Sequence, residues 1–312
     1  MKKILFLLPI IGLLLLLFTR PDVIASGCSL GLTLWYTAVL PSLLPFMILS
    51  GLLIRTGLFR YLNSVYAPFL GRLFSISDEG CYAVLLGFLC GFPMGAKVIA
   101  DLVQEGRISP EEGSYLLGFC NNVSPAFFLN YVCLQKLGYS SVPWKLVFLF
   151  YAIPLAYGLF TRPFYHFACH PGMKKQAPLH RLDFPMLDAC MMDGFSTITR
   201  LGGYIMLFTI LVQFLKLLPL SGPVPALLCA LLEISSGVDL LSALSLPPLL
   251  QNALVCTCTA LGGFCICAQT QSVLAGTPLS IRTWLKGRVI TASLVFLLVS
   301  LPGVVPTPPG CW

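Results

Sequence analysis

The stretch from Leu85 to Val132 is apolar enough to lie in a bilayer, but residues that interrupt helices break it twice. Gly91 to Lys97 (GFPMGAK) forms the first break, and Asn121 to Pro125 (NNVSP) forms the second. Lipid cannot hydrogen-bond the backbone groups that a break leaves free, so such backbone survives only when it packs inside protein or lines a wet cavity. Broken segments of this kind are the best sequence indication of a transporter binding site.

The composition fits this interpretation. The chain is 57% hydrophobic and only 10% charged, whereas soluble domains are about 25% charged. We predict an all-α, polytopic helical membrane protein with about 8 to 10 membrane-inserted segments. The 19 basic residues exceed the 12 acidic ones, and such an excess usually lies in cytoplasmic loops facing anionic lipid. Membrane lipid is therefore an expected partner. Nucleic acid is not expected, because no loop is long enough to form a basic face.

Segments at both ends and in the middle of the chain divide it into separate regions. Residues 1–22 read as an uncleaved N-terminal transmembrane helix with Lys2 and Lys3 in the cytoplasm. Residues 24–40 are only moderately apolar and indicate an interfacial or re-entrant helix before a strong span that begins at Pro41. Residues 162–185 form a basic loop, which the positive-inside rule places in the cytoplasm. Residues 302–312 are a short Pro-rich tail.

Helix start signals surround both breaks of the first half. Ser77, followed by two acids, predicts a helix that is too short to span before the first break, so we expect a re-entrant hairpin. Ser109 with Glu112 predicts a capping box, and Ser124 before Pro125 restarts a helix after the second break. Lys97, Asp101 and Glu105 follow at spacings of four, so they form one polar stripe on the returning arm of the hairpin. This stripe faces either water at the membrane edge or the site.

The second half repeats this order more weakly. Residues 186–200 are half apolar and 202–218 form a span. An apolar arm at 223–232 ends in a polar break from Glu233 to Gly237, and an arm at 249–261 ends in one from Gly262 to Gln271. Residues 281–301 form the last span, with Arg282, Lys286 and Arg288 on its entry side.

These similarities predict an internal repeat of residues 35–161 and 186–301. Gly95 aligns with Gly237, and the GFC of residues 118–120 aligns with the GFC of residues 263–265. An odd number of crossings between the halves would invert the repeat, as in many secondary transporters. The four breaks would then meet near the bilayer midplane.

The residue types at the breaks suit a small solute. Asn and Ser side chains offer donors and acceptors, and half-helix N-termini add partial positive charge. Glu233 is an acid in apolar surroundings, where it would bind a coupling proton or cation or simply pair with a nearby polar group. The candidate solute-binding residues are Gly91, Pro93, Gly95, Lys97, Asn121, Asn122, Ser124, Pro125, Glu233, Ser235, Ser236, Gly263 and Gln269.

Catalytic and metal signatures do not stand out. All three histidines lie in one loop, and no Ser/His/acid arrangement or phosphate-binding loop is visible. The two C-x-C pairs, at Cys256 and Cys265, do not have zinc or redox spacing, and most of the 13 cysteines lie in apolar runs as small hydrophobes. We therefore expect no enzyme, no cofactor and no metal site.

Five motifs together resemble the sporulation integral membrane protein family of the YlbJ type: LPSLLPFMILSGLL, GFPMGAK, GFCNNVSP, LEISSG and GGFCICAQ. The resemblance covers roughly residues 35 to 290. It implies two copies of the nucleoside-recognition Gate domain, which is distantly shared with concentrative nucleoside transporters and the membrane part of the ferrous-iron transporter FeoB. It also implies an inner-membrane location and a role in endospore formation.

Two functions remain open at this point. The breaks favour a secondary transporter or solute gate for an unidentified small solute, with or without a coupling cation. The resemblance alone also allows a non-transporting assembly protein of sporulation that acts through membrane partners or as a homo-oligomer.

Overall fold

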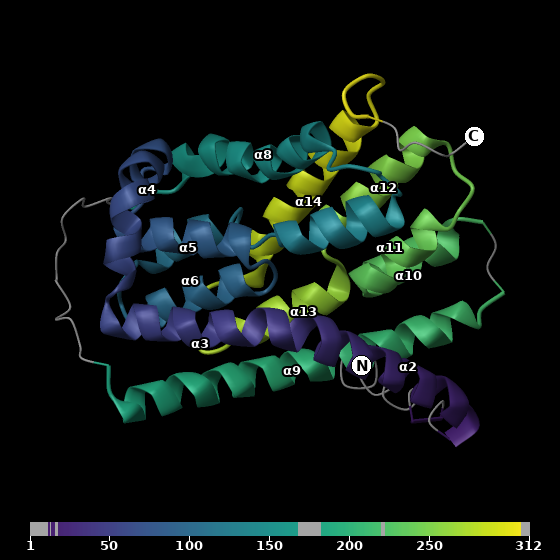
Figure 1. Cartoon of the computed structure of the whole chain (residues 1–312), viewed down its shortest axis with the longest axis horizontal. Helices are drawn as coiled ribbons and strands as arrows, with labels where there is room; N and C mark the ends of the chain where they lie inside the picture. The colour runs from purple at the N-terminus through teal and green to yellow at the C-terminus, as the bar shows by residue number, and fades with distance from the viewer. Residues whose placement is uncertain (1–11, 13, 16–17, 168–181, 220–221, 307–312) are drawn as a thin grey trace, which may run out of the picture.

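The structure, a computed structural model, describes residues 12, 14–15, 18–167, 182–219 and 222–306. Within these ranges every regular element is a helix, which confirms the predicted all-α membrane fold. Most helices run roughly side by side along the long axis of the molecule, and α4 crosses one end of the bundle (Figure 1). The bounds are α2 Pro21–Leu34, η1 Trp35–Val39, α3 Leu40–Thr56, α4 Phe59–Phe74, α5 Asp78–Leu89, α6 Met94–Gln104, α7 Pro110–Leu117, η2 Phe127–Lys136, α8 Trp144–Thr161, η3 Arg162–Phe164, α9 Phe184–Lys216, α10 Val224–Leu232, α11 Ile234–Ser242, α12 Pro248–Leu261, α13 Gly263–Val273 and α14 Ile281–Val299.

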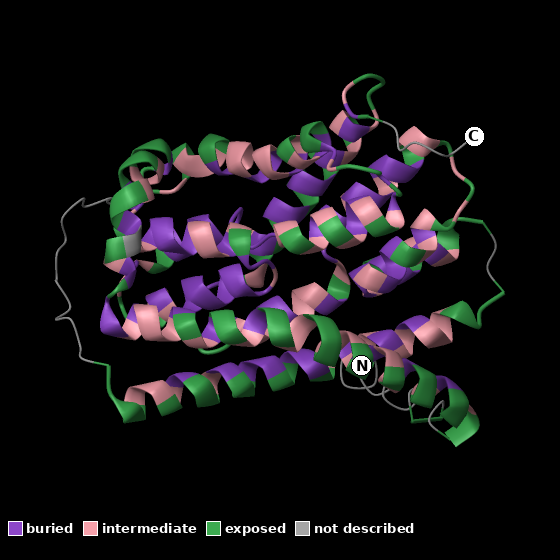
Figure 2. Cartoon of the chain, in the orientation of Figure 1, coloured by how far each residue is buried: buried purple, intermediate pink, exposed green. Residues whose placement is uncertain are grey.

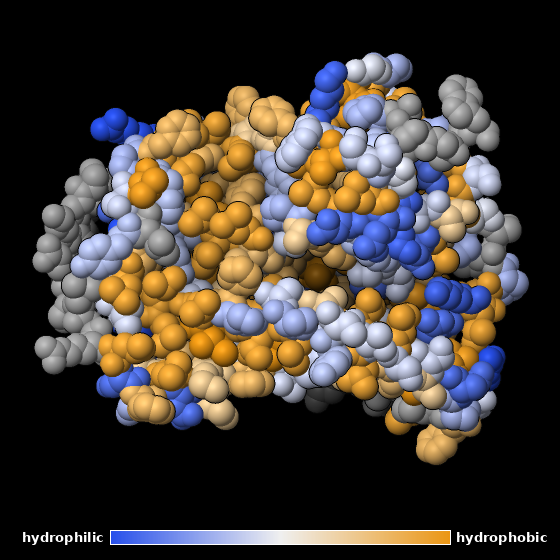
Figure 3. Space-filling model, viewed as in Figure 1, coloured by the Kyte–Doolittle hydropathy of each residue, from blue (hydrophilic) through white to orange (hydrophobic). Residues whose placement is uncertain are grey.

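Four helical stretches are long and apolar enough to cross a membrane: Pro21–Thr56, Trp144–Phe164, Phe184–Lys216 and Pro248–Val273. Large apolar side chains are exposed on them, such as Phe148 and Phe160 of α8. Figure 3 shows apolar residues covering much of one face of the bundle, over α3, α5 and α8. The chain is therefore an integral membrane protein with several spans. Most of the predicted N-terminal helix lies outside the described residues.

The segment at 24–40 does not form a separate interfacial helix, contrary to one sequence expectation. Pro21 to Thr56 is one continuous helical stretch. A π-helical turn, η1, directly precedes α3. Pro41 occupies the first turn of α3, where a missing N–H is tolerated. The helix therefore continues through Pro41 without ending.

The long helix α9 joins two segments that the sequence separates. The half-apolar residues 186–200 and the span at 202–218 form a single helix of 33 residues. Its apolar half packs against α2, where Gly27 and Gly31 allow close approach to Ile210 and Met206. Glycines spaced by four commonly form such contacts between membrane helices. The result is a lower layer of α2, α3 and α9 (Figure 1).

The first half contains the predicted hairpin and broken helix. Ser77 caps α5 by accepting from the Gly80 N–H at 3.0 Å. The chain turns at Gly91, whose φ is +84°, and α6 returns from Met94. After α7 the backbone leaves helical geometry for residues 118–124 and resumes at Pro125, where the Ser124 hydroxyl accepts from the Phe127 N–H at 3.3 Å.

Glu112 does not complete the predicted capping box. Ser109 does cap α7, accepting from the Glu112 N–H at 3.1 Å. The Glu112 carboxylate, however, reaches Ser77 instead, where it accepts from the backbone N–H and the hydroxyl at 2.7 Å each. A partner on another helix replaces the local one because Glu112 is buried and faces α5. It therefore ties the start of α7 to the start of the hairpin.

The second half has a similar order of elements without a counterpart of α4: a long helix (α9), a hairpin (α10 and α11) turning at Glu233, a helix broken at Gly262 (α12 and α13), and a final helix (α14). The last break is shorter than the sequence suggests. Helix α13 starts at Gly263, so Gly263 to Gln271 is helical. Two consecutive glycines with positive φ, Gly262 and Gly263, complete the change of direction in two residues. The repeat and its inversion remain predictions.

Candidate functional site

The two hairpins and the two broken helices meet inside the molecule. A Cβ added at Gly91 would lie 2.5 Å from the Ser124 nitrogen, so the tip of the first hairpin packs directly on the second break. The Phe92 ring lies 3.4 Å from the position of a Cβ at Gly262. Gly263 is similarly close to the carbonyl of Ala230 in the second hairpin. The tip of the first hairpin thus contacts both breaks, and the break at Gly262 also contacts the last turn of α10. Most of the nearby backbone is buried (Figure 2).

Asn121 connects three of these segments. Its side-chain carbonyl accepts from the Ala96 N–H at 3.2 Å, in the first turn of α6. Its amide nitrogen donates to the Thr270 hydroxyl at 3.2 Å, across the two halves of the chain. Its own carbonyl accepts from the Trp284 indole at 3.3 Å. Asn121, with no exposed surface, therefore uses its side chain and its backbone to hold hairpin, break and second half together.

Asn122 faces a buried cation. Its amide nitrogen donates to the Phe119 carbonyl at 2.7 Å, and its carbonyl accepts from Arg288 Nη1 at 2.5 Å. The Arg288 side chain lies on α14 and the residue is 2% exposed. Its Nε and Nη2 have no hydrogen-bond partner among the described residues, and no carboxylate there pairs with it. An unneutralised buried charge is costly, and in a membrane protein it indicates a functional position.

Glu233 is buried at the turn of the second hairpin. Its two carboxylate oxygens accept from the N–H groups of Ser235 and Ser236 at 2.9 and 2.8 Å, so Glu233 caps α11. A carboxylate at a helix N-terminus is favoured by the partial positive charge there. Gln269, on α13, donates to the Cys265 sulfur of its own helix at 3.2 Å. The predicted role of Glu233 in binding a coupling ion remains a prediction.

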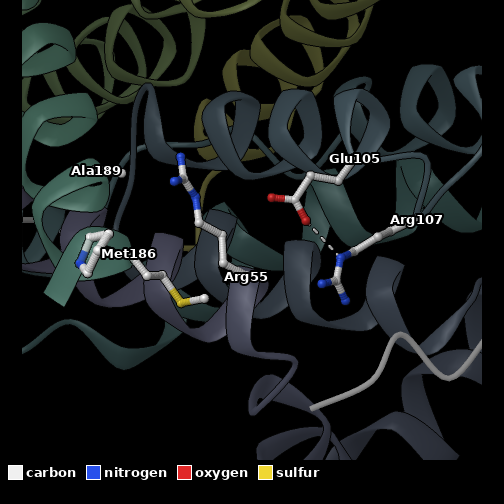
Figure 4. A pocket seen from close by; sticks show the side chains of 6 residues that line it. Arg55, Glu105, Arg107, Met186 and Ala189 are labelled. Atoms are coloured by element: carbon white, nitrogen blue, oxygen red, sulfur yellow. Dashed lines mark hydrogen bonds and ion pairs between the residues drawn. The ribbon is translucent and has the colours of Figure 1, made fainter. Parts of the chain in front are cut away.

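Lys97 points away from the breaks. Its ammonium contacts both oxygens of Asp101 at 2.7 and 2.9 Å, and Asp193 of α9 at 2.9 Å. The polar stripe of α6 thus faces α9 and not the centre of the site. Beyond it, Glu105 and Arg107 pair at 2.9 Å in an open pocket of about 500 Å³. Figure 4 shows Arg55 extending into this pocket between Glu105 and Met186.

The predicted residues fall into three groups. The first group surrounds the meeting point of the breaks: Gly91, Pro93, Gly95, Asn121, Asn122, Ser124, Pro125, Gly263 and Gln269. The second group forms the turn of the second hairpin: Glu233, Ser235 and Ser236. Lys97 stands apart. The sequence interpretation missed Arg288, Trp284 and Asp193. Arg288 had a usable signal, since it is a charge six residues before an uninterrupted apolar run, but the sequence places it on the entry side of the last span.

No protein-family model and no solved structure matches the chain. The chain is similar to the sporulation integral membrane protein YlbJ of Bacillus subtilis (strain 168). The identity is 26% over an alignment 327 positions long, which covers 91% of this chain and 78% of that protein. The similarity supports the resemblance to the YlbJ family along nearly the whole chain.

Proposed function

We propose that this protein is a secondary transporter or solute gate whose solute binds where the four breaks meet. The observation that carries the proposal is the contact of the first hairpin tip with both helix breaks, beside the buried side chains of Asn121, Asn122 and Arg288. Discontinuous helices near the midplane are the usual way in which transporters form a polar site in apolar surroundings. A purely structural role does not require four helix interruptions to lie close together.

The side chains at this meeting point indicate the chemical class of the solute. Arg288 offers two unpaired donor nitrogens, and Asn121 and Asn122 add amide groups that can exchange partners. Such a site fits a small molecule with an acceptor group such as a carboxylate. All three residues are at most 2% exposed, so the structure corresponds to a closed state. Opening would require the hairpin tip at Gly91 to move from Ser124.

The biological setting comes from the relative. The similar Bacillus protein is a sporulation integral membrane protein, and we propose the same setting for this chain, in the inner membrane with its N-terminus in the cytoplasm. The proposal includes two Gate-like repeats related by inversion. The matching order α9 to α14 and α3 to α8 supports this, because each half has a hairpin, a broken helix and a final helix.

The experiment is solute uptake by vesicles containing the purified protein, with Asn121→Ala and Glu233→Ala tested singly. Both variants should lose uptake while remaining in the membrane. Exposed Asp188→Ala on α9 serves as a control and should transport normally. Uptake unchanged in both site variants would contradict the proposal.

The alternative is a membrane assembly protein of sporulation that transports nothing. It is favoured only by the relative's description. This function would depend on a protein partner that touches the loops, above all residues 162–185. Replacing that loop with a neutral linker would abolish sporulation if the assembly role is correct, and an intact phenotype would count heavily against it.

A further inference from the structure

The open pocket of about 500 Å³ lies where one membrane-spanning stretch ends and another begins. It is lined by Arg55, Glu105, Arg107, Pro185, Met186 and Ala189. The stretch Pro21–Thr56 ends at this pocket, and the stretch Phe184–Lys216 begins there. A Cβ added at Gly51 of α3 would lie 3.4 Å from the Cys190 sulfur of α9, so the two ends are adjacent. Since a charge is costly in hydrocarbon, Arg55 in the last turn of α3 places the pocket at the depth of the lipid headgroups.

Two sequence predictions agree that this pocket faces the cytoplasm. The basic loop at residues 162–185 is cytoplasmic by the positive-inside rule, and it leads directly into α9. An N-terminal helix that starts in the cytoplasm and crosses once would begin the Pro21–Thr56 stretch on the outer side, and this stretch would then return the chain to the cytoplasm at Arg55. The cytoplasmic leaflet carries anionic lipids, and basic pockets between membrane helices on that side bind their headgroups.

Arg55 is the cation of this pocket that has no partner. Among the described residues it makes no hydrogen bond, and no carboxylate lies within 4.0 Å of it. Arg107, in contrast, is held on three sides: it pairs with Glu105 at 2.9 Å, donates to the Ile54 carbonyl at 2.5 Å and lies over the Phe59 ring. Figure 4 shows Arg107 directed at Glu105, whereas Arg55 extends between Glu105 and Met186. The donors of the half-buried Arg55 are therefore available to a ligand.

The charge of the lining favours an anion at the mouth of the pocket. The two arginines of the lining outnumber its one glutamate, which leaves one excess positive charge. Further inside, Lys97 pairs with both Asp101 and Asp193, and this group carries one excess negative charge when all three are ionised. Asp101 lies one turn of α6 nearer the hairpin tip than Glu105. An anion is therefore attracted to Arg55 at the mouth and repelled from deeper positions.

Apolar side chains continue from the pocket along α9. Pro185, Ala189 and Met192 follow one another at spacings of four and three, so they share one face of the helix. Met192 is 62% exposed, on a helix that is long and apolar enough to cross the membrane. Phe184, next to the pocket lining, is also exposed. A molecule bound at Arg55 thus meets an apolar surface that extends toward the hydrocarbon.

We propose that this pocket binds the headgroup of an anionic phospholipid, with Arg55 donating to the lipid phosphate and an acyl chain lying along the Ala189 and Met192 face of α9. A guanidinium presents parallel N–H donors whose spacing matches two oxygens of a phosphate. A zwitterionic lipid offers the same phosphate but adds a cation, which the excess positive charge of the lining disfavours. The proposal does not rest on the solute site, so lipid binding and transport can fail separately.

The test compares three probes that share the phosphate group. Purified protein in detergent is titrated with phosphatidylglycerol, phosphatidylcholine or inorganic phosphate, and the Kd is taken from the dose dependence of Tm. The variants are Arg55→Gln, which removes the charge, and Arg55→Lys, which keeps the charge without the planar donor group and keeps the test decisive if Arg55→Gln does not fold. Arg72→Gln is the matched control, since Arg72 is an exposed arginine in the last turn of α4 and does not line the pocket.

Phosphatidylglycerol should raise the Tm of the wild type, whereas phosphatidylcholine and inorganic phosphate at the same concentration should have little effect. Arg55→Gln should weaken phosphatidylglycerol binding by at least about tenfold, as expected when hydrogen bonds to a charged group are lost. Arg55→Lys should fall between the wild type and Arg55→Gln, because an ammonium keeps the charge but loses the paired donors. Arg72→Gln should bind like the wild type.

Four results would overturn the proposal. Phosphatidylglycerol binding that is unchanged in both Arg55 variants would place the lipid elsewhere. Equal stabilisation by phosphatidylcholine would show that the pocket does not select an anionic headgroup. Equal stabilisation by inorganic phosphate would show a site for a soluble anion instead of a lipid. A Tm that responds to none of the three probes would show that the pocket binds no phosphate group.

Discussion

The side-chain nitrogen of Asn121 lies 3.2 Å from the hydroxyl of Thr270, to which it donates a hydrogen bond between the two halves of the chain. The residues are 149 positions apart, and both are fully buried. Asn121 lies in the break of the first half, and Thr270 lies on α13, which follows the break at Gly262, so this bond joins the two broken helices directly. A structure that opens between its halves must break it.

Asn121→Ala should lower the stability of the closed state and remove its response to solute. The substitution leaves the Ala96 N–H and the Thr270 hydroxyl buried without Asn121, which costs about 1 to 3 kcal/mol. Thermal unfolding in detergent measures the loss. The control is Asn130→Ala on the exposed face of η2, which should unfold like the wild type. Equal melting temperatures for all three proteins would show that Asn121 does not connect the halves.

Arg288→Gln should abolish solute binding with little effect on the stability of the fold. Glutamine keeps a donor for Asn122 and removes a buried charge with two unpartnered nitrogens, so stability should fall by no more than about 1 kcal/mol. Solute binding should nevertheless be lost, as measured by calorimetry with a ligand found for the wild type. Arg282→Gln, at the exposed start of the same helix, should bind normally. Binding that survives in Arg288→Gln would remove Arg288 from the site.

Gly237→Ala should disrupt the second hairpin. An added Cβ would lie 2.0 Å from the Ala230 Cα, which is backbone and cannot rotate away. Overpacking of this kind costs about 1 to 3 kcal/mol. Gly203→Ala on α9 is the matched control, because its Cβ would meet nothing within 4 Å, and helix propensity alone should leave it neutral or slightly more stable. A melting temperature that does not distinguish the two variants would be inconsistent with the close contact of α10 and α11.

Glu112→Ala should loosen the start of the first hairpin. The carboxylate accepts two hydrogen bonds from Ser77, and losing bonds to a charged group costs about 1.5 to 3 kcal/mol. Hydrogen exchange should rise in the first turn of α5 as well as in α7. Glu111→Ala is the control, since Glu111 is exposed one position earlier. If exchange rises in α7 alone, Glu112 acts only as a local cap.

Local signals in the sequence predicted most of the element boundaries. Ser77, Ser109 and Ser124 cap helices as expected, because capping depends on a few adjacent residues. The breaks at Gly91 and Gly262 were also visible, since positive φ strongly favours glycine. The joining of two predicted segments into one helix was less predictable. Residues 186–200 join α9 because nothing there ends a helix, although half of them are polar.

Contacts between distant segments could not be predicted from the sequence alone. Glu112 has a suitable local partner in Ser109 but binds Ser77, because packing of α7 on α5 brings that residue closer. Arg288 was read as a flanking charge, since a charge near the start of a span usually faces the headgroups. Only the position of α14 beside the second break shows that it is buried against Asn122. The ion pair of Lys97 with Asp193 likewise depends on how α6 lies against α9.

The most direct test of the solute site is thermal stabilisation of the purified protein by a panel of nucleosides, amino acids, small carboxylic acids and divalent metals. A ligand that binds only the folded form at 100 times its Kd adds about 2.7 kcal/mol of stability. The account predicts a dose-dependent rise in Tm for one chemical class, retained in Arg282→Gln and lost in both Asn121→Ala and Arg288→Gln. A rise that persists in both site variants would contradict a site at the four breaks.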